Sequence, residues 1–476
     1  MIKGKALYSQ IFFNHQPLMA FLSYWIQKIT QPISIYHLVI YHRKFILYFS
    51  LAMDFLMIFR FQRKGIAFVF FYEATKYYLM GNFFLPEALI AYLLAFNFGL
   101  LLESLWGKTL SQIDFLIASG FTFAVVFLGL PYIPIAILLY GLMLVSTKKN
   151  SLKQKSFSII IFLLLSTITL ISLPLKDYLF DLLIVNNQFI TSEVQRTGVT
   201  GLGLAKIFFY PLLIFLTGRP SFFRGILIGL AIVFFILLFF QILRRKKTKE
   251  ILLLIFLMGL AAIRFVPPGT VFYEAFHLLS WYAIFLVVIF YWMFELSGQK
   301  KFKKIFSLLA IFITIFWIYC FFSPKSFLME KADLQSEFTV NFAPYYSYGT
   351  VIKILAKSGD TLFLDQWDDL IYWASTLDSS FEYSLYTPAM IKFDKFNQAR
   401  LKMFEVNPPN FYYSYYGASE NCSPLFPEKY KNDYLQLFFS NKPTCLYIKR
   451  TKLAETSESQ WEEVKKLGFG LPNTTK

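Results

Sequence analysis

Two polar positions lie beside apolar segments, where an ionisable group is costly unless it is paired or lines a wet cavity. Glu87 begins an apolar run directly after Pro86, so the simplest interpretation is a first-turn carboxylate stabilised by the helix dipole. The alternative is a ligand for a substrate or a metal ion that faces an external cavity. His15 and Asn14 precede Pro17 and another apolar helix. A surface turn explains them without any function, and only their expected position on the same side as Glu87 favours a site.

Positive side chains at the outer ends of apolar segments form a second set of candidates, because they suit an anionic headgroup, particularly a phosphate. The set comprises Lys206, Arg219, Arg224 and Arg264. Snorkelling of long side chains to the membrane interface is the alternative, and we expect it to explain at least half of them. Arg264 is the best placed, since a Pro-Pro-Gly turn follows it and Tyr273, Glu274 and His277 come next on the following helix.

Other ionisable groups have simpler explanations. Glu73 and Lys76 stand three residues apart on one helical face and are expected to neutralise each other. Asp54 lies nearer the cytoplasmic end of its helix, where ordinary pairing between helices is the expected role. The sequence contains no P-loop, GxSxG or HExxH motif and no Cys/His cluster with metal-ligand spacing. A nucleotide-driven cytosolic enzyme and a zinc or redox site are therefore disfavoured.

The elements that must position these residues are apolar runs long enough to cross a bilayer, for which a helix needs about 20 residues. Of the 476 residues, 57% are hydrophobic and 16% are charged. The expected spans are 44–60, 65–80, 86–105, 113–130, 131–147, 157–174, 222–243, 250–266, 271–294 and 305–322. These runs predict an α-helical polytopic membrane protein with about ten spans.

Charge is distributed unevenly along the chain. Residues 1–322 contain 29 Lys and Arg against 11 Asp and Glu, whereas 323–476 contain 17 against 18. The net charge of +17 therefore belongs to the membrane part, which argues against nucleic acid as a partner. Positive residues gather in alternate connections, at 60–65, 108, 146–155, 244–250 and 298–304. By the positive-inside rule these five connections face the cytoplasm, and the N-terminus, the intervening loops and the tail lie outside.

Two segments complicate this alternation. If the apolar segment 202–216 crossed the membrane, the basic connections would no longer alternate between its two sides. We therefore expect this segment to be re-entrant or interfacial and to close an external loop over 175–221. The first 32 residues form an amphipathic stretch with neither a cleavable signal nor a convincing first span. An N-terminus outside the membrane predicts either unaided translocation of a short tail or an upstream helix that this chain lacks.

The long apolar runs end before 323–324, which predicts a membrane domain over 1–322 and an extracytoplasmic domain over 323–476. Helical spacing at 350–360 and 459–468 and strand-like patterns at 360–365, 381–386 and 443–450 predict a small α/β domain. Asp365, Asp368 and Asp369 resemble a metal-binding string, but a strand end followed by a helix start explains them better. Cys422 and Cys445 form one disulfide if the tail faces an oxidising compartment, and two free thiols are the alternative.

Six segments carry a family resemblance. Along the chain they are GKALYSQIFFNHQPLMAFL, FLPEALIAYLLAFNFGLLL, DFLIASGFTFAVVFLGLPYIPIAILLY, IRFVPPGTVFYEAFHLLSWYAIFLV, GDTLFLDQWDDLIYWAS and NPPNFYYSYYG. Together they resemble the GT-C superfamily of polytopic glycosyltransferases, which includes protein mannosyltransferases and bacterial enzymes that act on polyprenyl-phosphate sugars. The first is similar to the family's external loop and juxtamembrane helix, and in the second Glu87 takes the position of an acidic residue. The fourth is similar to the late Arg-containing loop and its Tyr- and His-bearing helix, and the last two look like the α/β domain of many bacterial members.

The chain departs from the family at its start. Gln16 replaces the first proline of the loop motif. Members normally begin with a transmembrane helix and an acidic residue in the first external loop, and neither stands here. The resemblance therefore predicts an N-terminally incomplete sequence or a degenerate member, and it implies that the chain as given is inactive while an extended form is active.

The resemblance implies a hexosyltransferase of the cell membrane that moves a sugar from a polyprenyl-phosphate donor to a glycan, lipid or protein acceptor on the extracytoplasmic face. Glu87 and His15 would be catalytic, and Glu87 would also be the candidate ligand of a divalent metal ion, the one cofactor suggested. The substrate-binding residues would line the cavity or hold the phosphate. They are Asn14, Lys206, Arg219, Arg224, Arg264, Tyr273 and His277.

Two other functions fit the same hydropathy. A transporter or flippase of lipid-linked polymer precursors shares the external cations, but it is expected to show inverted repeats or broken helices, which are not evident in this sequence. A noncatalytic membrane scaffold whose tail binds a partner is the third hypothesis.

Overall fold

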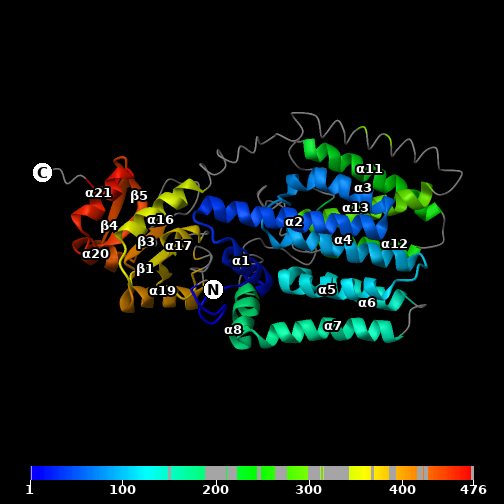
Figure 1. Cartoon of the computed structure of the whole chain (residues 1–476), viewed down its shortest axis with the longest axis horizontal. Coiled ribbons are helices and arrows are strands. Elements are labelled where there is room, and N and C mark those ends of the chain that lie inside the picture. The colour runs from blue at the N-terminus through cyan, green and yellow to red at the C-terminus, as the bar shows by residue number, and fades with distance from the viewer. Residues whose placement is uncertain are drawn as a thin grey trace. The chain divides into compact units, whose positions relative to one another are not determined.

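The computed structural model divides the chain into two compact units (Figure 1). The helical unit comprises Asn14–Ile29 and Tyr41–Lys331, and the α/β unit comprises Met1–Phe13, Thr30–Ile40 and Ala332–Lys476. The residues that the structure describes are 1, 3–147, 152–187, 211, 222–243, 248–262, 276–297, 311, 315, 342–365, 369–384, 387, 393–414, 422 and 427–472.

The helices in the first two thirds of the chain are α1 (Pro17–Thr30), α2 (Ile35–Phe61), α3 (Arg63–Thr75), the 3₁₀ turn η1 (Lys76–Leu79), α4 (Pro86–Leu105), α5 (Gln112–Leu128), α6 (Ile133–Ser146), α7 (Leu152–Ile171), α8 (Leu175–Leu179), α11 (Phe222–Leu243), α12 (Thr248–Ala261) and α13 (Leu279–Ser297). Most of these helices overlap the expected spans, whereas α1 and α8 correspond to no expected span. Helix α2 begins earlier than expected because Ser34 Oγ accepts a hydrogen bond from the His37 amide, as a helix cap does. The segments expected at 202–216 and 305–322 lie outside the described residues, apart from 211, 311 and 315.

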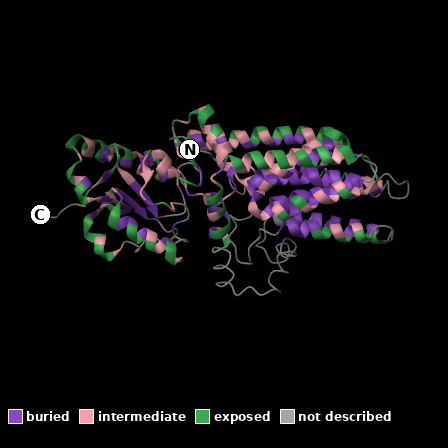
Figure 2. Ribbon diagram, turned by 90° about the horizontal axis from the view of Figure 1, so that it is seen from below, coloured by how far each residue is buried: buried purple, intermediate pink, exposed green. Residues whose placement is uncertain are grey.

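Within the described residues, four helices have the length and apolar composition needed to cross a membrane: Pro86–Leu105, Leu152–Ile171, Gly225–Ile242 and Phe276–Ser297. Of the most apolar 18 residues of each helix, 94% are buried in Pro86–Leu105 and 6% in Leu152–Ile171. Helices α4 and α13 therefore form the core of the helical unit (Figure 2), whereas α7 exposes Ile160, Leu163 and Ile168. A long helix with exposed apolar side chains suits contact with lipid, which supports a membrane protein.

Ion pairs join the ends of several helices that lie next to the basic connections at 60–65 and 108. Arg60, at the end of α2, binds both carboxylate oxygens of Asp114 in the first turn of α5, with N–O distances of 2.5 and 3.1 Å. The same guanidinium donates to Glu103, near the end of α4, at 3.0 Å. Lys64, at the start of α3, lies over the ring of Tyr291 on α13, 3.4 Å from its centroid. The ends of these five helices therefore lie together.

Two further hydrogen bonds add α6 and α11 to this cluster of helix ends. Ser104 and Ser146 share a hydroxyl hydrogen bond of 2.7 Å, and Gln241 donates to Glu295 at 3.2 Å. We call this the basic end of the helical unit. Since a helix rises about 1.5 Å per residue, the N-terminus of the 20-residue α4 lies about 30 Å from it.

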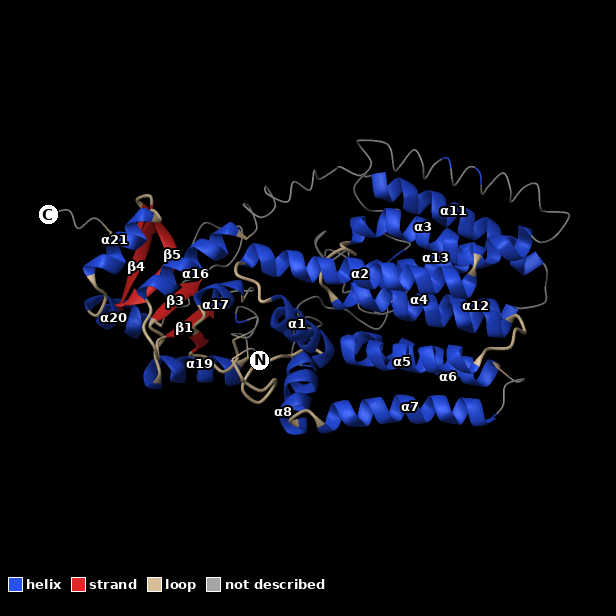
Figure 3. Cartoon of the chain, in the orientation of Figure 1, coloured by secondary structure: helices blue, strands red, loops and turns tan. Residues whose placement is uncertain are grey.

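The α/β unit contains a mixed sheet, which within the described residues has six strands in the order β2-β1-β3-β5-β4-β6 (Figure 3). Its elements are α16 (Ala343–Leu355), β1 (Thr361–Asp365), α17 (Leu370–Ser375), β2 (Asp378–Ser379), α19 (Asp394–Val406), β3 (Phe411–Ser414), η5 (Glu428–Asp433), β4 (Tyr434–Phe439), β5 (Lys442–Lys449), α20 (Arg450–Ala454), α21 (Glu458–Lys466) and β6 (Phe469–Gly470). Strand β1 pairs in parallel with β2 and β3, and the remaining pairs are antiparallel.

Both faces of this sheet are covered, because successive side chains of a strand point to opposite sides. Leu362 and Leu364 of β1 join a core with residues of α16, α17 and α21. Phe363, between them, joins a second core with Phe404 of α19 and Tyr412 of β3. The tail is therefore an α/β domain, as its sequence predicts.

The structure confirms several expected elements of the tail. Strands β1 and β5 match the patterns at 360–365 and 443–450, and α21 matches the helix expected at 459–468. Helix α21 starts at a capping box in which Ser457 and Gln460 satisfy each other's backbone amides. Helix α16 ends earlier than expected, at Leu355.

The strand expected at 381–386 is wrong, because the described part, 381–384, forms no strand. The chain instead pairs just before it, at Asp378–Ser379, and Ser379 Oγ then accepts a hydrogen bond of 3.1 Å from the Phe381 amide. The Phe381 ring packs against Phe363, and Tyr383 packs against Phe396. The alternation of aromatic residues reflects packing under α19, not pairing in the sheet.

The first thirteen residues belong to the α/β unit, although the sequence predicts a membrane domain from residue 1. Lys3 and Lys5 each bind a carboxylate oxygen of Asp378 at 3.1 Å, and Phe12 packs edge-on against Tyr383. Burial opposes the charge of Asp378, but hydrogen bonds from Lys5 and Lys3 outweigh it and lower the pKa of Asp378. This segment is therefore an integral part of the domain surface.

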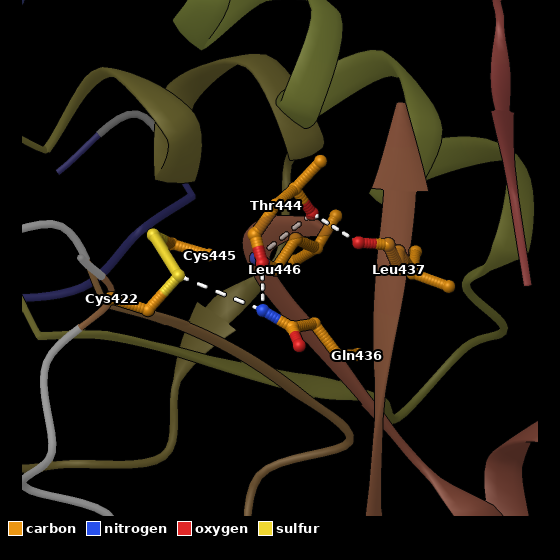
Figure 4. The surroundings of a disulfide bond; sticks show 6 residues. All are labelled: Cys422, Gln436, Leu437, Thr444, Cys445 and Leu446. Atoms are coloured by element: carbon orange, nitrogen blue, oxygen red, sulfur yellow. Dashed lines mark hydrogen bonds between the residues drawn. A yellow bond between two sulfur atoms is a disulfide. The ribbon is translucent and has the colours of Figure 1, made fainter. Parts of the chain in front are cut away.

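Cys422 and Cys445 form a disulfide (Figure 4), which resolves the alternative that the sequence leaves open. Gln436 donates to the carbonyl oxygen of Thr444 at 2.7 Å and approaches Cys422 Sγ at 3.7 Å. Thr444 Oγ1 in turn donates to the Leu437 carbonyl at 2.7 Å. The disulfide thus ties residue 422 to the β4–β5 hairpin.

Replacing both cysteines with serine is expected to destabilise the α/β unit by about 3 kcal/mol, because the disulfide closes a loop of 23 residues in the unfolded chain. Thermal unfolding of the purified full-length protein, with and without reductant, measures the effect. Reductant should lower the melting temperature of the wild type and leave that of the double variant unchanged. Equal responses of the two proteins to reductant would contradict the disulfide.

Candidate functional site

Glu87 and His277 meet at the N-terminal ends of α4 and α13. Pro86 is the first residue of α4, where its fixed φ angle suits a helix start, and it places Glu87 in the first turn. His277 lies in the helical turn directly before α13. The distance between Glu87 Oε1 and His277 Nδ1 is 3.4 Å, and both residues are buried, with exposures of 0% and 8%. Two candidates that the sequence places 190 residues apart therefore share one site.

The Glu87 carboxylate lies close to the imidazole, but within the described residues Nδ1 of His277 is buried and makes no hydrogen bond. A carboxylate that does bind Nδ1 of a histidine holds the proton on that nitrogen and leaves Nε2 as a proton acceptor. The Phe276 ring packs against the imidazole with ring centroids 4.1 Å apart, which further restricts it. A carboxylate–imidazole pair of this kind can accept a proton from a hydroxyl group and return it.

A second polar layer lies one and a half turns further along the same two helices. Tyr92 and Tyr282 each stand five residues beyond Glu87 and His277, a rise of about 7.5 Å in a helix. Tyr282 shares a hydrogen bond of 2.7 Å with Thr75, and its ring lies near that of Tyr72. These tyrosines are not predicted as site residues from the sequence, although a buried hydroxyl in an apolar span needs a partner and is a usable signal.

Glu73 and Lys76 pair in this second layer at 2.6 Å, which confirms the expected neutralisation. The Lys76 ammonium also donates to Ser50 Oγ and to the Tyr92 hydroxyl, each at 2.9 Å. Asp54 is buried and interacts electrostatically with Glu73 and Lys76. These groups belong to α3 and η1, so Asp54 of α2 interacts with neighbouring helices, and its expected role in ordinary pairing stays a prediction.

The N-terminal polar cluster contacts the segment after α7. Asn186 donates to the Asn14 carbonyl oxygen at 2.7 Å, and Tyr178 donates to Gln16 Oε1 at 2.9 Å. His15, which lies between Asn14 and Gln16 in the sequence, is half-buried. These contacts give Asn14 and Gln16 roles in holding the start of the expected external loop.

The remaining candidates lie beyond the part of the chain that the structure describes. They are Lys206, Arg219, Arg264 and Tyr273, together with the side chain of Arg224, whose backbone belongs to α11. The phosphate-binding role that the resemblance implies for the four cations therefore remains a prediction.

Asp365 has a structural role in the tail. Arg400 Nη2 and the Tyr412 hydroxyl donate to Asp365 Oδ2 at 2.7 and 2.9 Å, and all three side chains are buried. Burial, and then the neighbouring Asp365 carboxylate, raise the pKa of Tyr412. Asp365 thus ends a strand as expected, and its carboxylate binds an arginine.

Among the described residues, no three His, Cys, Asp or Glu side chains gather closely enough to hold a metal ion. Glu87 and His277 alone make a poor set for a divalent cation such as Mg²⁺ or Ca²⁺, which prefers several oxygen ligands.

No family model matches this chain, and neither a curated protein nor a solved structure matches it. The functional conclusions therefore rest on the geometry of the site and on the resemblance of its segments.

Proposed function

We propose that this chain is a membrane glycosyltransferase with about ten spans, which moves a sugar from a polyprenyl-phosphate donor to an acceptor hydroxyl. The observation that carries the proposal is the buried Glu87–His277 pair at the N-terminal ends of α4 and α13. Both residues stand in segments that resemble the GT-C superfamily. Their meeting in one place supports a common chemical role.

The orientation of the pair supports an extracytoplasmic site. The basic end of the helical unit adjoins the connections rich in Lys and Arg, which the positive-inside rule assigns to the cytoplasm. The Glu87–His277 pair lies at the other end of α4 and α13. Donor, acceptor and the α/β unit would then share the outer side of the cell membrane.

In the proposed reaction, Nε2 of neutral His277 accepts the proton of the acceptor hydroxyl as its oxygen attacks the anomeric carbon of the sugar. The bond between that carbon and the phosphate oxygen breaks, and its electron pair leaves with the polyprenyl phosphate. Glu87 orients the imidazole and stabilises the imidazolium that forms. Arg264, with Lys206, Arg219 or Arg224, is proposed to stabilise the leaving phosphate.

A transfer assay tests the proposal. Nanodiscs that contain the purified protein are incubated with a panel of polyprenyl-phosphate sugars labelled in the sugar and with glycan, lipid and protein acceptors. We expect labelled acceptor and free polyprenyl phosphate in equal amounts, because the Glu87–His277 pair is proposed to supply the base whose absence would make the chain as given inactive. An intact donor in every incubation would contradict the proposal.

A transporter or flippase of lipid-linked precursors is the second candidate. The buried Asp54 and Lys76 and the half-buried Glu73 favour it, because such groups mark ion pathways in membrane proteins. Reconstitution into liposomes separates the two functions. Movement of labelled donor between leaflets without release of polyprenyl phosphate supports the transporter.

A further inference from the structure

A cluster of charged and hydroxyl groups lies inside the helical unit, within the segments expected to span the membrane. It contains Asp54 of α2, Glu73 of α3, Lys76 of η1 and the hydroxyls of Tyr72 and Tyr92. The Lys76 side chain is 4% exposed and pairs at 2.6 Å with Glu73, whose side chain is 28% exposed. Tyr92 donates to the same Glu73 carboxylate. The ammonium charge is therefore already matched by one carboxylate.

Asp54 leaves this cluster with one negative charge too many if all its groups are ionised. Asp54 is 7% exposed, and within the described part of the chain the charged groups that interact with it are Glu73 and Lys76. The hydroxyls of Tyr72, Tyr77 and Tyr92 also lie within electrostatic range of it. None of these tyrosines carries a positive charge. An uncompensated charge in a membrane interior is strongly unfavourable, so Asp54 requires a positive charge beyond those of the described residues.

Two buried oxygen atoms of the cluster point to where that charge lies. Among the described residues, Asp54 Oδ1 and the Tyr72 hydroxyl have no hydrogen-bond partner. Both are buried and lie within electrostatic range of each other. Buried polar atoms in native proteins nearly always have partners. An oxygen of the unbalanced carboxylate and a hydroxyl near it, both without a partner in the described residues, indicate a small bound ligand.

We propose that Asp54, together with the Tyr72 hydroxyl and Glu73, binds one monovalent cation, a proton or an alkali-metal ion, inside the helical unit. One positive charge balances the cluster, because Lys76 already neutralises Glu73. A divalent cation would leave an excess of positive charge. This inference goes beyond sugar transfer and does not depend on it.

Linkage between binding and stability tests the proposal. Thermal unfolding of the full-length protein in nanodiscs is measured in NaCl and in choline chloride, from pH 5 to pH 9. This is roughly the range in which such a site can exchange a proton. The proteins are the wild type, Asp54→Asn and, as a control, Asp177→Asn of α8. The asparagine side chain keeps the shape of a neutral carboxyl group and removes the charge.

If the ligand is a proton, the wild type should lose several degrees of melting temperature as the pH rises, equally in both salts. If it is an alkali-metal ion, NaCl should raise the melting temperature relative to choline chloride at high pH. In either case Asp54→Asn should abolish the dependence and Asp177→Asn should retain it. Parallel curves for the wild type and Asp54→Asn in both salts would overturn the proposal.

A measurement on the wild type keeps the proposal testable if Asp54→Asn fails to fold. Infrared spectra of protein that contains ¹³C-labelled aspartate identify the carbonyl band of a protonated aspartic acid by its isotope shift. The proton form predicts such a band at neutral pH, and the alkali-metal form predicts a sodium-dependent melting temperature instead. The lack of both in the wild type would overturn the proposal.

Discussion

Replacing His277 with Gln is expected to lower the rate of sugar transfer by roughly 10²–10⁴-fold, because a positioned general base contributes about that much. Glu87→Gln should have a smaller effect, roughly 10–100-fold, because Glu87 acts by orienting the imidazole. Single-turnover kinetics with saturating donor measures both. The loss should appear in the chemical step, while the Kd for the donor changes little.

Two variants serve as matched controls. His37→Gln changes a half-buried histidine of α2, and Glu250→Gln removes a first-turn carboxylate from α12, at the basic end. Both should transfer sugar at the wild-type rate. If Glu87→Gln and Glu250→Gln behave alike, the carboxylate of Glu87 only stabilises its helix, and the proposed role of the pair is contradicted.

Replacing Arg400 with Met is expected to destabilise the α/β unit by about 3–5 kcal/mol, because it leaves the buried Asp365 carboxylate without its positive partner. The side chains of Arg400 and Asp365 are 6% and 1% exposed, so water cannot replace the guanidinium. Hydrogen exchange of the β1 and β3 amides in the full-length protein measures the free energy of opening.

A double variant separates the loss of the ion pair from the loss of packing. Arg400→Met combined with Asp365→Leu removes both charges, and it should be less destabilising than Arg400→Met alone. Lys429→Met, which breaks the exposed pair with Glu405, should leave the exchange rates unchanged. Equal protection in Arg400→Met and the wild type would show that the pair contributes nothing to stability.

Much of the helical unit could be predicted from the sequence, because local features set its helix boundaries. Pro86 starts α4, and a capping box between Ser111 and Asp114 starts α5. In the tail, Ser457 starts α21 in the same way. Strand β3 was not predicted, because the aromatic run at 411–414 acquires its strand conformation from pairing with β1 and β5, which are distant in sequence.

For the candidate site, too, some features follow from the sequence and others only from the tertiary structure. The sequence by itself determined four apolar helices long enough to cross a membrane, the basic connections and the individual residues Glu87 and His277, since each depends on composition or on a short segment. Only the tertiary structure decided that α4 and α13 pack together and bring these two side chains within 3.4 Å. It also placed Asp54 beside Glu73 and Lys76, and Asp365 beside Arg400. Such partnerships depend on helix rotation and sheet register, which contacts between distant segments specify and local sequence does not.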